Sequence, residues 1–132
     1  MIVLDASAAV DFLVRRDDRG DWVAARIAEA DGVNAPHLLD TEVASAVRGL
    51  VASRQIPARA GGAALATLSS MPLLRFPAYL LLERIWSLRD NLTAFDATYV
   101  ALAEALGFPL VTTDQRLARA AGHRALVTAF PG

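Results

Sequence analysis

Short runs of β-branched and apolar residues alternate with helical patterns along this chain. The run 2–4 precedes a helical pattern, and the same order recurs after 33–35 and 110–113. Strands that alternate with helices are joined by crossovers, so the strands pair in parallel and helices cover both faces. We therefore predict an α/β fold around a parallel sheet. The predicted strands are 2–4, 33–35, 73–76, 110–113 and 125–128, and the predicted helices are 8–14, 21–30, 38–53, 57–68, 79–89, 94–106 and 114–121.

The size and composition predict one domain spanning residues 1–132 with a single core. The net charge is −1, so the chain lacks the overall positive charge that is typical of a strongly basic nucleic-acid-binding domain. The N-terminus lacks the pattern of a secretory signal, and no apolar run approaches the ~20 residues that span a bilayer. We predict a cytoplasmic protein that makes no membrane contact. Apolar residues make up 55% of the chain, which suggests a partner surface.

Four carboxylates occupy positions unlike those of the other acids. Asp5 and Asp114 each follow an apolar strand and precede a helix, and ligands of open parallel sheets bind beyond the carboxyl ends of strands. Glu42 and Asp96 lie on or beside the apolar stripes of their predicted helices. The chain has no cysteine and no lysine, so oxygen ligands are its main chemical resource. Clustered carboxylates repel one another, and such a cluster often holds a divalent cation such as Mg²⁺ or Mn²⁺.

Each of these acids also has a structural interpretation when taken alone. Asp5 and Asp114 are suited to cap the helices that they precede. Glu42 and Asp96 could be half-buried acids, each paired with an arginine. The joint occurrence of all four, at these positions, favours the metal site.

The order and spacing of these acids resemble those of the PIN-domain ribonucleases, and within them the VapC toxins of bacterial toxin–antitoxin pairs. Three blocks carry the resemblance: VLDASA at 3–8, PHLLDTEV at 36–43, and LTAFDATYVALA at 92–103, which leads to LVTTD at 110–114. The last block is the most specific, and together the blocks span nearly the whole chain. The resemblance implies a PIN-like three-layer α/β/α fold with a central parallel sheet of about four to five short strands.

The resemblance also implies an Mg²⁺-dependent endoribonuclease, with Mn²⁺ as the alternative ion, that cuts RNA by activating water with one or two ions. Asp5, Glu42, Asp96 and Asp114 would form the catalytic and metal-binding pocket, with Asp5 and Asp96 as direct ligands. Ser7 and Thr113 would support the pocket through their hydroxyls, and a cap or turn hydroxyl is the alternative interpretation for each. Asp40 and His37 are excluded, because Asp40 points to another helix face and His37 lacks any ligand spacing.

Two groups of arginines are candidates for holding RNA. Arg116 and Arg119 follow Asp114 and are closer in sequence to the pocket than the group at 15–19. Ion pairs or a solvated face explain either group equally well. The target RNA and its cleavage sequence are not encoded in any pattern that we recognise.

Protein partners are predicted from the apolar surplus and from the resemblance. The segment 80–88 is apolar around much of its circumference, more than one core-facing stripe needs. The resemblance implies a homodimer and a cognate VapB-type antitoxin, with which the dimer can assemble further. That antitoxin would lie across apolar helices and reach an arginine into the acidic site. Trp22 and Phe12 are further candidates for this groove, with core packing as the default.

Three other classes compete with this interpretation. A phosphoacceptor receiver domain needs a lysine in its site, and the chain has none. A phosphohydrolase of the DxDxT kind needs an acid two residues after Asp5, where Ser7 stands. A non-catalytic PIN-like module that binds RNA or protein remains the alternative function.

Overall fold

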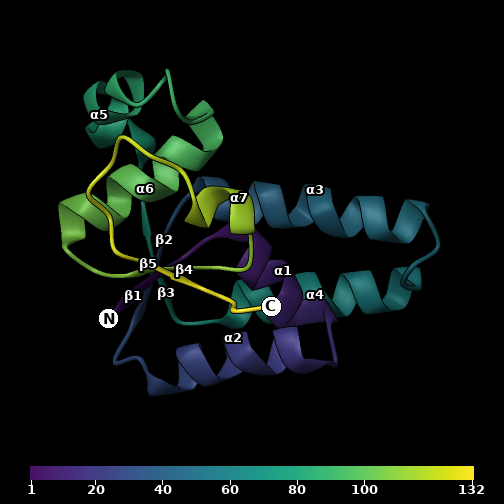
Figure 1. The fold of residues 1–132 in the computed structure, drawn as a ribbon. Coiled ribbons are helices and arrows are strands. Elements are labelled where there is room, and N and C mark those ends of the chain that lie inside the picture. Colours follow the sequence, from purple (N-terminus) through teal and green to yellow (C-terminus); the bar gives the residue numbers. More distant parts are fainter.

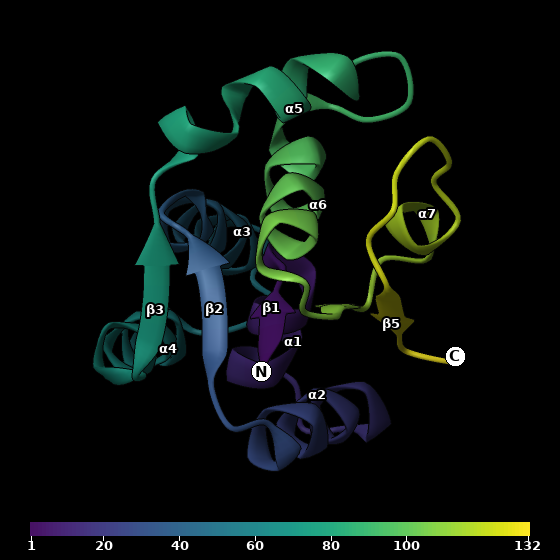
Figure 2. The same ribbon diagram turned by 90° about the vertical axis from the view of Figure 1, so that its left-hand side faces the viewer.

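The computed structural model describes residues 1–132, which form a five-stranded parallel sheet. The strand order is β3-β2-β1-β4-β5, so β1 lies at the centre between β2 and β4 (Figure 2). Every pair of neighbours is parallel, which confirms the predicted sheet. The strands are β1 (Ile2–Leu4), β2 (Val33–Pro36), β3 (Leu73–Phe76), β4 (Leu110–Thr112) and β5 (Val127–Ala129).

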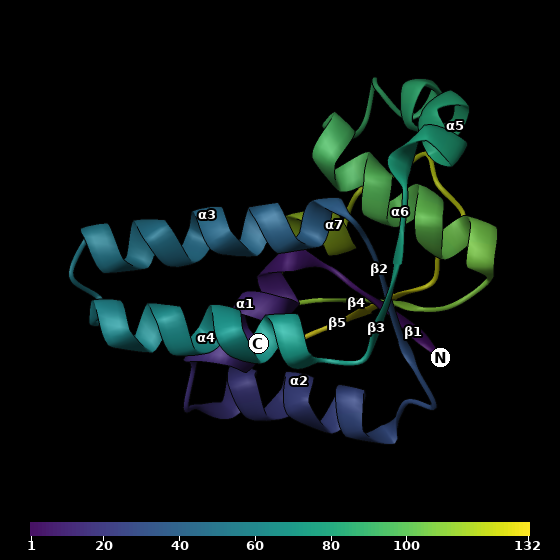
Figure 3. The same ribbon diagram turned by 180° about the vertical axis from the view of Figure 1, so that it is seen from behind.

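Helices cover both faces of the sheet, as predicted. The pair α5 and α6 lies on one side, and α1 to α4 lie on the other (Figures 1 and 2). The long antiparallel pair α3 and α4 projects beyond the sheet (Figure 3). The helices are α1 (Ala6–Val14), α2 (Asp18–Glu29), α3 (Leu38–Ala52), α4 (Ala58–Ser70), the 3₁₀ helix η1 (Ala78–Leu81), α5 (Leu82–Ser87), α6 (Ala94–Leu106) and α7 (Gln115–Ala118).

The core lies between the sheet and these two helical layers. Val3 and Leu4 of the central strand are fully buried, as are Leu110 and Val111 beside them. Continuous apolar character is what strands covered on both faces require. Close helix packing also depends on Gly61 of α4, because a Cβ there would lie 2.9 Å from a methyl carbon of α3. No helix is long and apolar enough to cross a membrane.

Several predicted elements differ from the structure at their ends, and α1 and α2 begin at Ala6 and Asp18 instead of residues 8 and 21. The segment predicted as one helix at 79–89 forms two shorter helices. The 3₁₀ helix η1 ends at Leu81, and α5 begins at Leu82. The helix predicted at 114–121 is the single turn α7. The last strand is shifted to β5, whose neighbour β4 sets its register through Leu110 and Val127.

Two helices begin beside each other at the carboxyl ends of adjacent strands. Asp5 follows β1 and caps α1, and Asp114 follows β4 and caps α7. Because β1 and β4 are adjacent and parallel, both acids lie beyond the same carboxyl ends. The backbone amide of Asp5 donates to the carbonyl oxygen of Val111 at 3.2 Å, which ties the end of β1 to β4.

Candidate active site at the carboxyl ends of β1 and β4

Asp5 is held in one orientation by three hydrogen bonds. Its Oδ1 accepts from the Ser7 hydroxyl at 2.8 Å and from the backbone amide of Ala8 at 2.9 Å. Its Oδ2 accepts from the hydroxyl of Thr112 at 2.5 Å. The side chain therefore caps α1, as the structural interpretation proposed, but it is also joined to β4 across the sheet. Capping and a role in the site are compatible here.

Thr112 connects the two strand ends, and sequence reasoning missed it. Besides donating to Asp5, its Oγ1 accepts from the backbone amide of Asp114 at 3.0 Å. Thr113 was predicted to support the pocket through its hydroxyl, and in the structure that hydroxyl donates to Asp11 at 2.6 Å. Side chains alternate across a strand, so adjacent threonines at the end of β4 point to opposite sides. The sequence showed two adjacent threonine hydroxyls at this position. Which of the two faces Asp5 depends on the register of β4, which the sequence alone does not give.

Burial raises the pKa of Asp5 from its ordinary value of 3.8 to about 6. The three hydrogen bonds favour the carboxylate and lower this pKa, whereas the nearby charge of Asp114 raises it slightly. Asp5 is 4% exposed and has no ion-pair partner. A buried carboxylate without a counter-charge costs free energy, and a bound cation would remove that cost.

Asp96 and Asp114 share one arginine. The Nη2 atom of Arg116 lies 3.3 Å from Oδ2 of Asp114 and 3.9 Å from Oδ2 of Asp96. Burial raises the pKa of Asp96, with the charge of Asp114 acting in the same direction and the charge of Arg116 opposing it. Thr93, the cap of α6, accepts from the backbone amide of Asp96 at 3.1 Å and so fixes the first turn of that helix.

Glu42 is positioned by Tyr99, a second residue that sequence reasoning did not assign to the site. The hydroxyl of Tyr99 donates to Oε1 of Glu42 at 2.6 Å. Burial is the largest cause that raises the pKa of Tyr99, and the hydrogen bond to the Glu42 carboxylate is the second. The hydroxyl therefore stays protonated as a donor. The charges of Asp5 and Asp96 also raise that pKa. The spacing of Asp96 and Tyr99, three residues apart on α6, was the available signal.

The donor set fits a divalent cation of the Mg²⁺ class. Such ions prefer oxygen ligands and keep several waters, so few carboxylates suffice. Asp114 is linked to Asp5 through Thr112 and to Asp96 through Arg116, and its charge raises the pKa of both acids. In this structure no group of three or more Asp, Glu or His side chains lies close enough together to hold a metal ion by itself. Water and a substrate phosphate would complete the coordination.

The remaining candidates lie outside this group. Asp40 forms a two-point ion pair with Arg75 at 2.7 and 2.9 Å, as expected of an acid on another helix face. His37 is exposed and supplies no side-chain bond to α3. Nε of Arg119 donates to the carbonyl oxygen of Gln115 within α7. Arg15 and Arg19 of the other basic group lie 4.0 and 3.9 Å from carboxylate oxygens of Asp11, which matches the ion-pair interpretation for that group.

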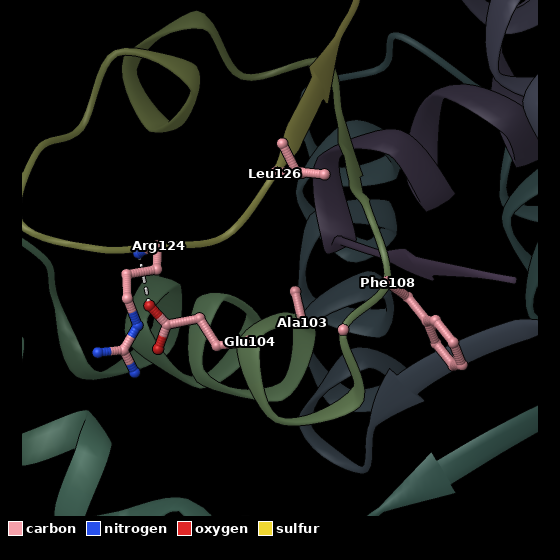
Figure 4. A pocket seen from close by; sticks show the side chains of 6 residues that line it. Ala103, Glu104, Phe108, Arg124 and Leu126 are labelled. Carbon is pink, nitrogen blue, oxygen red and sulfur yellow. Dashed lines mark hydrogen bonds between the residues drawn. The ribbon is translucent and has the colours of Figure 1, made fainter.

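Two cavities near α6 differ in their relation to the acids. An open cavity of about 430 Å³ is lined by Glu42 and Phe95, together with residues of α3. A second cavity, of about 190 Å³, lies at the other end of α6 and is lined by none of the four acids (Figure 4). Its carboxylate, Glu104, is paired with Arg84 at 2.7 Å and accepts from the backbone amide of Arg124, so it is fully satisfied. Only the first cavity adjoins the site.

A family model described as PIN domain matches residues 2–123. The fold and the acid-lined sheet edge are those of this class, and the chain belongs to the PIN-domain family. Within it, the chain is 42% identical to ribonuclease VapC9 of Mycobacterium tuberculosis over 131 residues, 99% of both chains. These sequence relatives are VapC ribonucleases, which confirms the family resemblance predicted from the three motif blocks.

Solved structures show the same fold. The M. tuberculosis toxin VapC20, which cleaves the sarcin–ricin loop, matches with a TM-score of 0.71 at 20% identity, over 96% of this chain and 98% of that one. VapBC2 from Rickettsia felis, bound to a DNA fragment from its promoter, matches with a TM-score of 0.68 at 16% identity, over 98% and 99% of the two chains. At these identities the likeness establishes the three-layer fold.

Proposed function

We propose that this chain is a metal-dependent endoribonuclease and the toxin of a VapBC-type toxin–antitoxin pair. The observation that carries the proposal is the buried carboxylate of Asp5, oriented by Ser7, Ala8 and Thr112 and lacking a cationic partner. The 42% identity to VapC ribonucleases over nearly the whole chain supports the same reaction class. RNA is the proposed substrate, the cytoplasm the proposed location, and one PIN domain the proposed extent of residues 1–132.

Asp5, Glu42, Asp96 and Asp114 would hold one Mg²⁺ ion or two, with Mn²⁺ as a substitute. When bound, such an ion polarises a phosphate oxygen and makes water a better nucleophile. The protein's own contribution is to present the carboxylates in fixed positions. Thr112 and Ser7 hold Asp5, and Tyr99 holds Glu42 at the rim of the open cavity beside Phe95.

RNA would approach through the open cavity and contact the exposed arginines of α7. We propose Arg116 and Arg119 as phosphate contacts, because a guanidinium presents a planar fork of donors to phosphate. Both side chains are exposed, and Arg116 lies beside Asp96 and Asp114. A basic contact of this kind makes binding dependent on salt concentration.

The experiment that tests the function is cleavage of total RNA by purified protein in Mg²⁺. We expect discrete cuts, complete loss of cleavage in EDTA, and recovery on addition of Mg²⁺ or Mn²⁺. The variant Asp96→Asn should lose more than about a hundredfold in rate, since even outer partners of metal ligands cost 10–100-fold. The matched control is Asp90→Asn, an exposed acid outside the site, which should cleave like the parent.

Cleavage that persists in EDTA would exclude the metal-dependent reaction. Metal binding by folded protein that cuts no RNA would instead favour the non-catalytic PIN-like module. Cutting by the folded Asp96→Asn protein at the parent rate would remove Asp96 from the site. Thermal unfolding of each variant establishes that it is folded before its rate is compared.

Partner surfaces are proposed on both helical layers. The apolar segment predicted to exceed one core-facing stripe does so, because Leu81, Ile85 and Leu88 are buried while Leu82 and Trp86 are 58% and 68% exposed. We propose that this exposed surface of η1 and α5 contacts a second copy of the chain. Trp22, in contrast, packs against Phe130 with ring centroids 5.7 Å apart, as an ordinary packing residue would.

The antitoxin is proposed to bind the opposite layer. A cavity of about 210 Å³ between α1 and α4 is lined mainly by apolar residues, with Arg16 at its edge. Another cavity, of about 340 Å³, is lined by α3 and α4 and carries Arg48. An amphipathic segment with apolar anchors and acidic flanks suits such grooves.

Replacing Trp86 with glutamate should raise the dissociation constant of the proposed dimer by about thirtyfold or more, because large buried aromatics dominate interface energies. Light scattering coupled to size-exclusion chromatography measures the change in mass with concentration. The control is Glu83→Gln on the same helix, where the parent side chain is already exposed and polar. A dimer of unchanged affinity in Trp86→Glu would place the interface elsewhere.

A further inference from the structure

Arg116 is the only cation within ion-pair distance of any of the four acids. It approaches Asp114 at 3.3 Å and Asp96 at 3.9 Å, and neither Asp5 nor Glu42 forms an ion pair. One guanidinium thus lies beside the two carboxylates that come from α6 and from the end of β4. This side chain is the local counter-charge to both carboxylates.

The side chain of Arg116 is nevertheless free to leave. It is 78% exposed, and ion pairs of exposed arginines are weak. Its backbone amide donates to Oδ1 of Asp114 at 2.9 Å, and the amide of Leu117 approaches the same oxygen at 3.4 Å. These backbone bonds keep Asp114 in place whichever way the guanidinium points.

A divalent cation and this guanidinium would compete for the same oxygen atoms. Two like charges at one pair of carboxylates repel, so the arrival of the ion favours departure of Arg116. The displaced guanidinium stays on α7, next to the site, with its donors unpaired. Its preferred partner there is a phosphate group of RNA, which accepts a planar pair of hydrogen bonds.

We propose that Arg116 occupies two alternative positions: it neutralises Asp96 and Asp114 in the free protein, and it binds an RNA phosphate once a divalent cation has displaced it. This inference rests on the proposed function, because it requires that Asp96 and Asp114 hold the ion. The two positions couple the ligands. Metal binding frees Arg116 to contact an RNA phosphate, and RNA binding draws Arg116 away from the two carboxylates that would bind the metal. Each ligand therefore raises the affinity for the other by the same factor.

The first test is Mn²⁺ affinity in the absence of RNA, from the electron paramagnetic resonance signal of the free ion. Arg116→Gln should bind Mn²⁺ about threefold to tenfold more tightly than the parent, since the competing charge is gone. The matched control is Arg119→Gln, which removes the same charge from the same helix but bonds only to a backbone carbonyl. It should stay within about twofold of the parent. A variant Arg116→Gln that binds Mn²⁺ no more tightly than Arg119→Gln overturns the proposal.

The second test measures the coupling itself. A fully 2′-O-methylated phosphorothioate oligonucleotide of mixed sequence, verified intact afterwards, is titrated in EDTA and in Mn²⁺. The gain in RNA affinity on adding Mn²⁺ should shrink by about threefold or more in Arg116→Gln and be retained in Arg59→Gln, which removes an exposed charge from α4, outside the proposed phosphate contacts. An equal gain in all three proteins contradicts the inference.

The two failures are distinguishable. If the parent protein binds Mn²⁺ and cleaves RNA but Arg116→Gln changes neither titration, only the inference of two positions for Arg116 is contradicted. Parent protein that binds no Mn²⁺ removes the metal site and the inference together. Because Arg116 is exposed and α7 retains its backbone caps, the variant should fold, and its unfolding temperature verifies this.

Discussion

The variant Asp5→Asn should lose RNA cleavage by more than about a hundredfold and yet be more stable than the parent at pH 7.5 in EDTA. The loss follows from the amide, which is a poorer ligand and carries no charge. The gain in stability follows from burial, which raises the pKa of Asp5 to about 6 and so penalises its ionised form. A shift of this size corresponds to about 2 to 3 kcal/mol of unfolding free energy at neutral pH.

The sign of the pH dependence separates this effect from a change in packing. The folded pKa of Asp5 lies above its unfolded value, so the folded state binds the proton more tightly. The stability that this group contributes is complete below about pH 4 and is lost as the pH rises through about 6. Urea unfolding of parent and variant in EDTA should therefore agree near pH 4 and diverge at pH 7.5. A variant less stable than the parent at pH 7.5 would mean that the carboxylate is stabilised as an anion.

The variant Thr112→Val should weaken both the fold and the reaction. Valine keeps the shape and removes the hydroxyl, so Oδ2 of Asp5 loses its donor and the amide of Asp114 loses its acceptor. Each buried polar group left without a partner costs about 1 to 3 kcal/mol, so for two such groups we expect a loss of about 2 to 6 kcal/mol in unfolding free energy. Cleavage should fall by about 10–100-fold, because the carboxylate is no longer oriented.

The neighbouring threonine supplies the control. Thr113→Val removes a hydroxyl from the same turn but breaks only the bond to Asp11. We expect about 1 kcal/mol of lost stability and cleavage close to that of the parent. Equal losses of cleavage in the two variants, measured on folded protein under the same conditions, would restore Thr113 to the site and contradict the geometry around Asp5.

The sheet was predictable because its signal is dense and local. Every predicted strand has a counterpart, and α6 begins and ends where the cap residues Thr93 and Gly107 indicated. Predictions failed where a segment's structure depends on its neighbours. The turn from η1 to α5 and the brevity of α7 depend on how those segments rest against α6 and β5, and no periodicity in residues 79–89 or 114–121 records that.

For the site, sequence reasoning selected the acids and Ser7, whose hydroxyl donates to Asp5, and missed two other residues that hold the acids. Asp5 and Asp114 were identifiable because each follows an apolar run and precedes a helix. Tyr99 and Thr112 were not, because buried tyrosine and strand threonine are ordinary core residues until their hydroxyls are seen to meet Glu42 and Asp5. The choice between adjacent threonines is a question of strand face. A one-residue error in assigning the strand face selects Thr113, whose hydroxyl does not contact Asp5, instead of Thr112, whose hydroxyl does.

The hydrogen bond between Thr112 and Asp5 spans 107 positions of the chain, and this has a consequence during translation. At roughly 5 to 20 residues per second, about 5 to 20 seconds separate the synthesis of these two ends of the site. The strand that completes the sheet centre, β4, is among the last parts made, and such distant pairings also fold slowly. A nascent chain therefore carries no assembled nuclease for most of its synthesis. In a chain of this family, the order of synthesis therefore delays assembly of the candidate site until the chain is nearly complete.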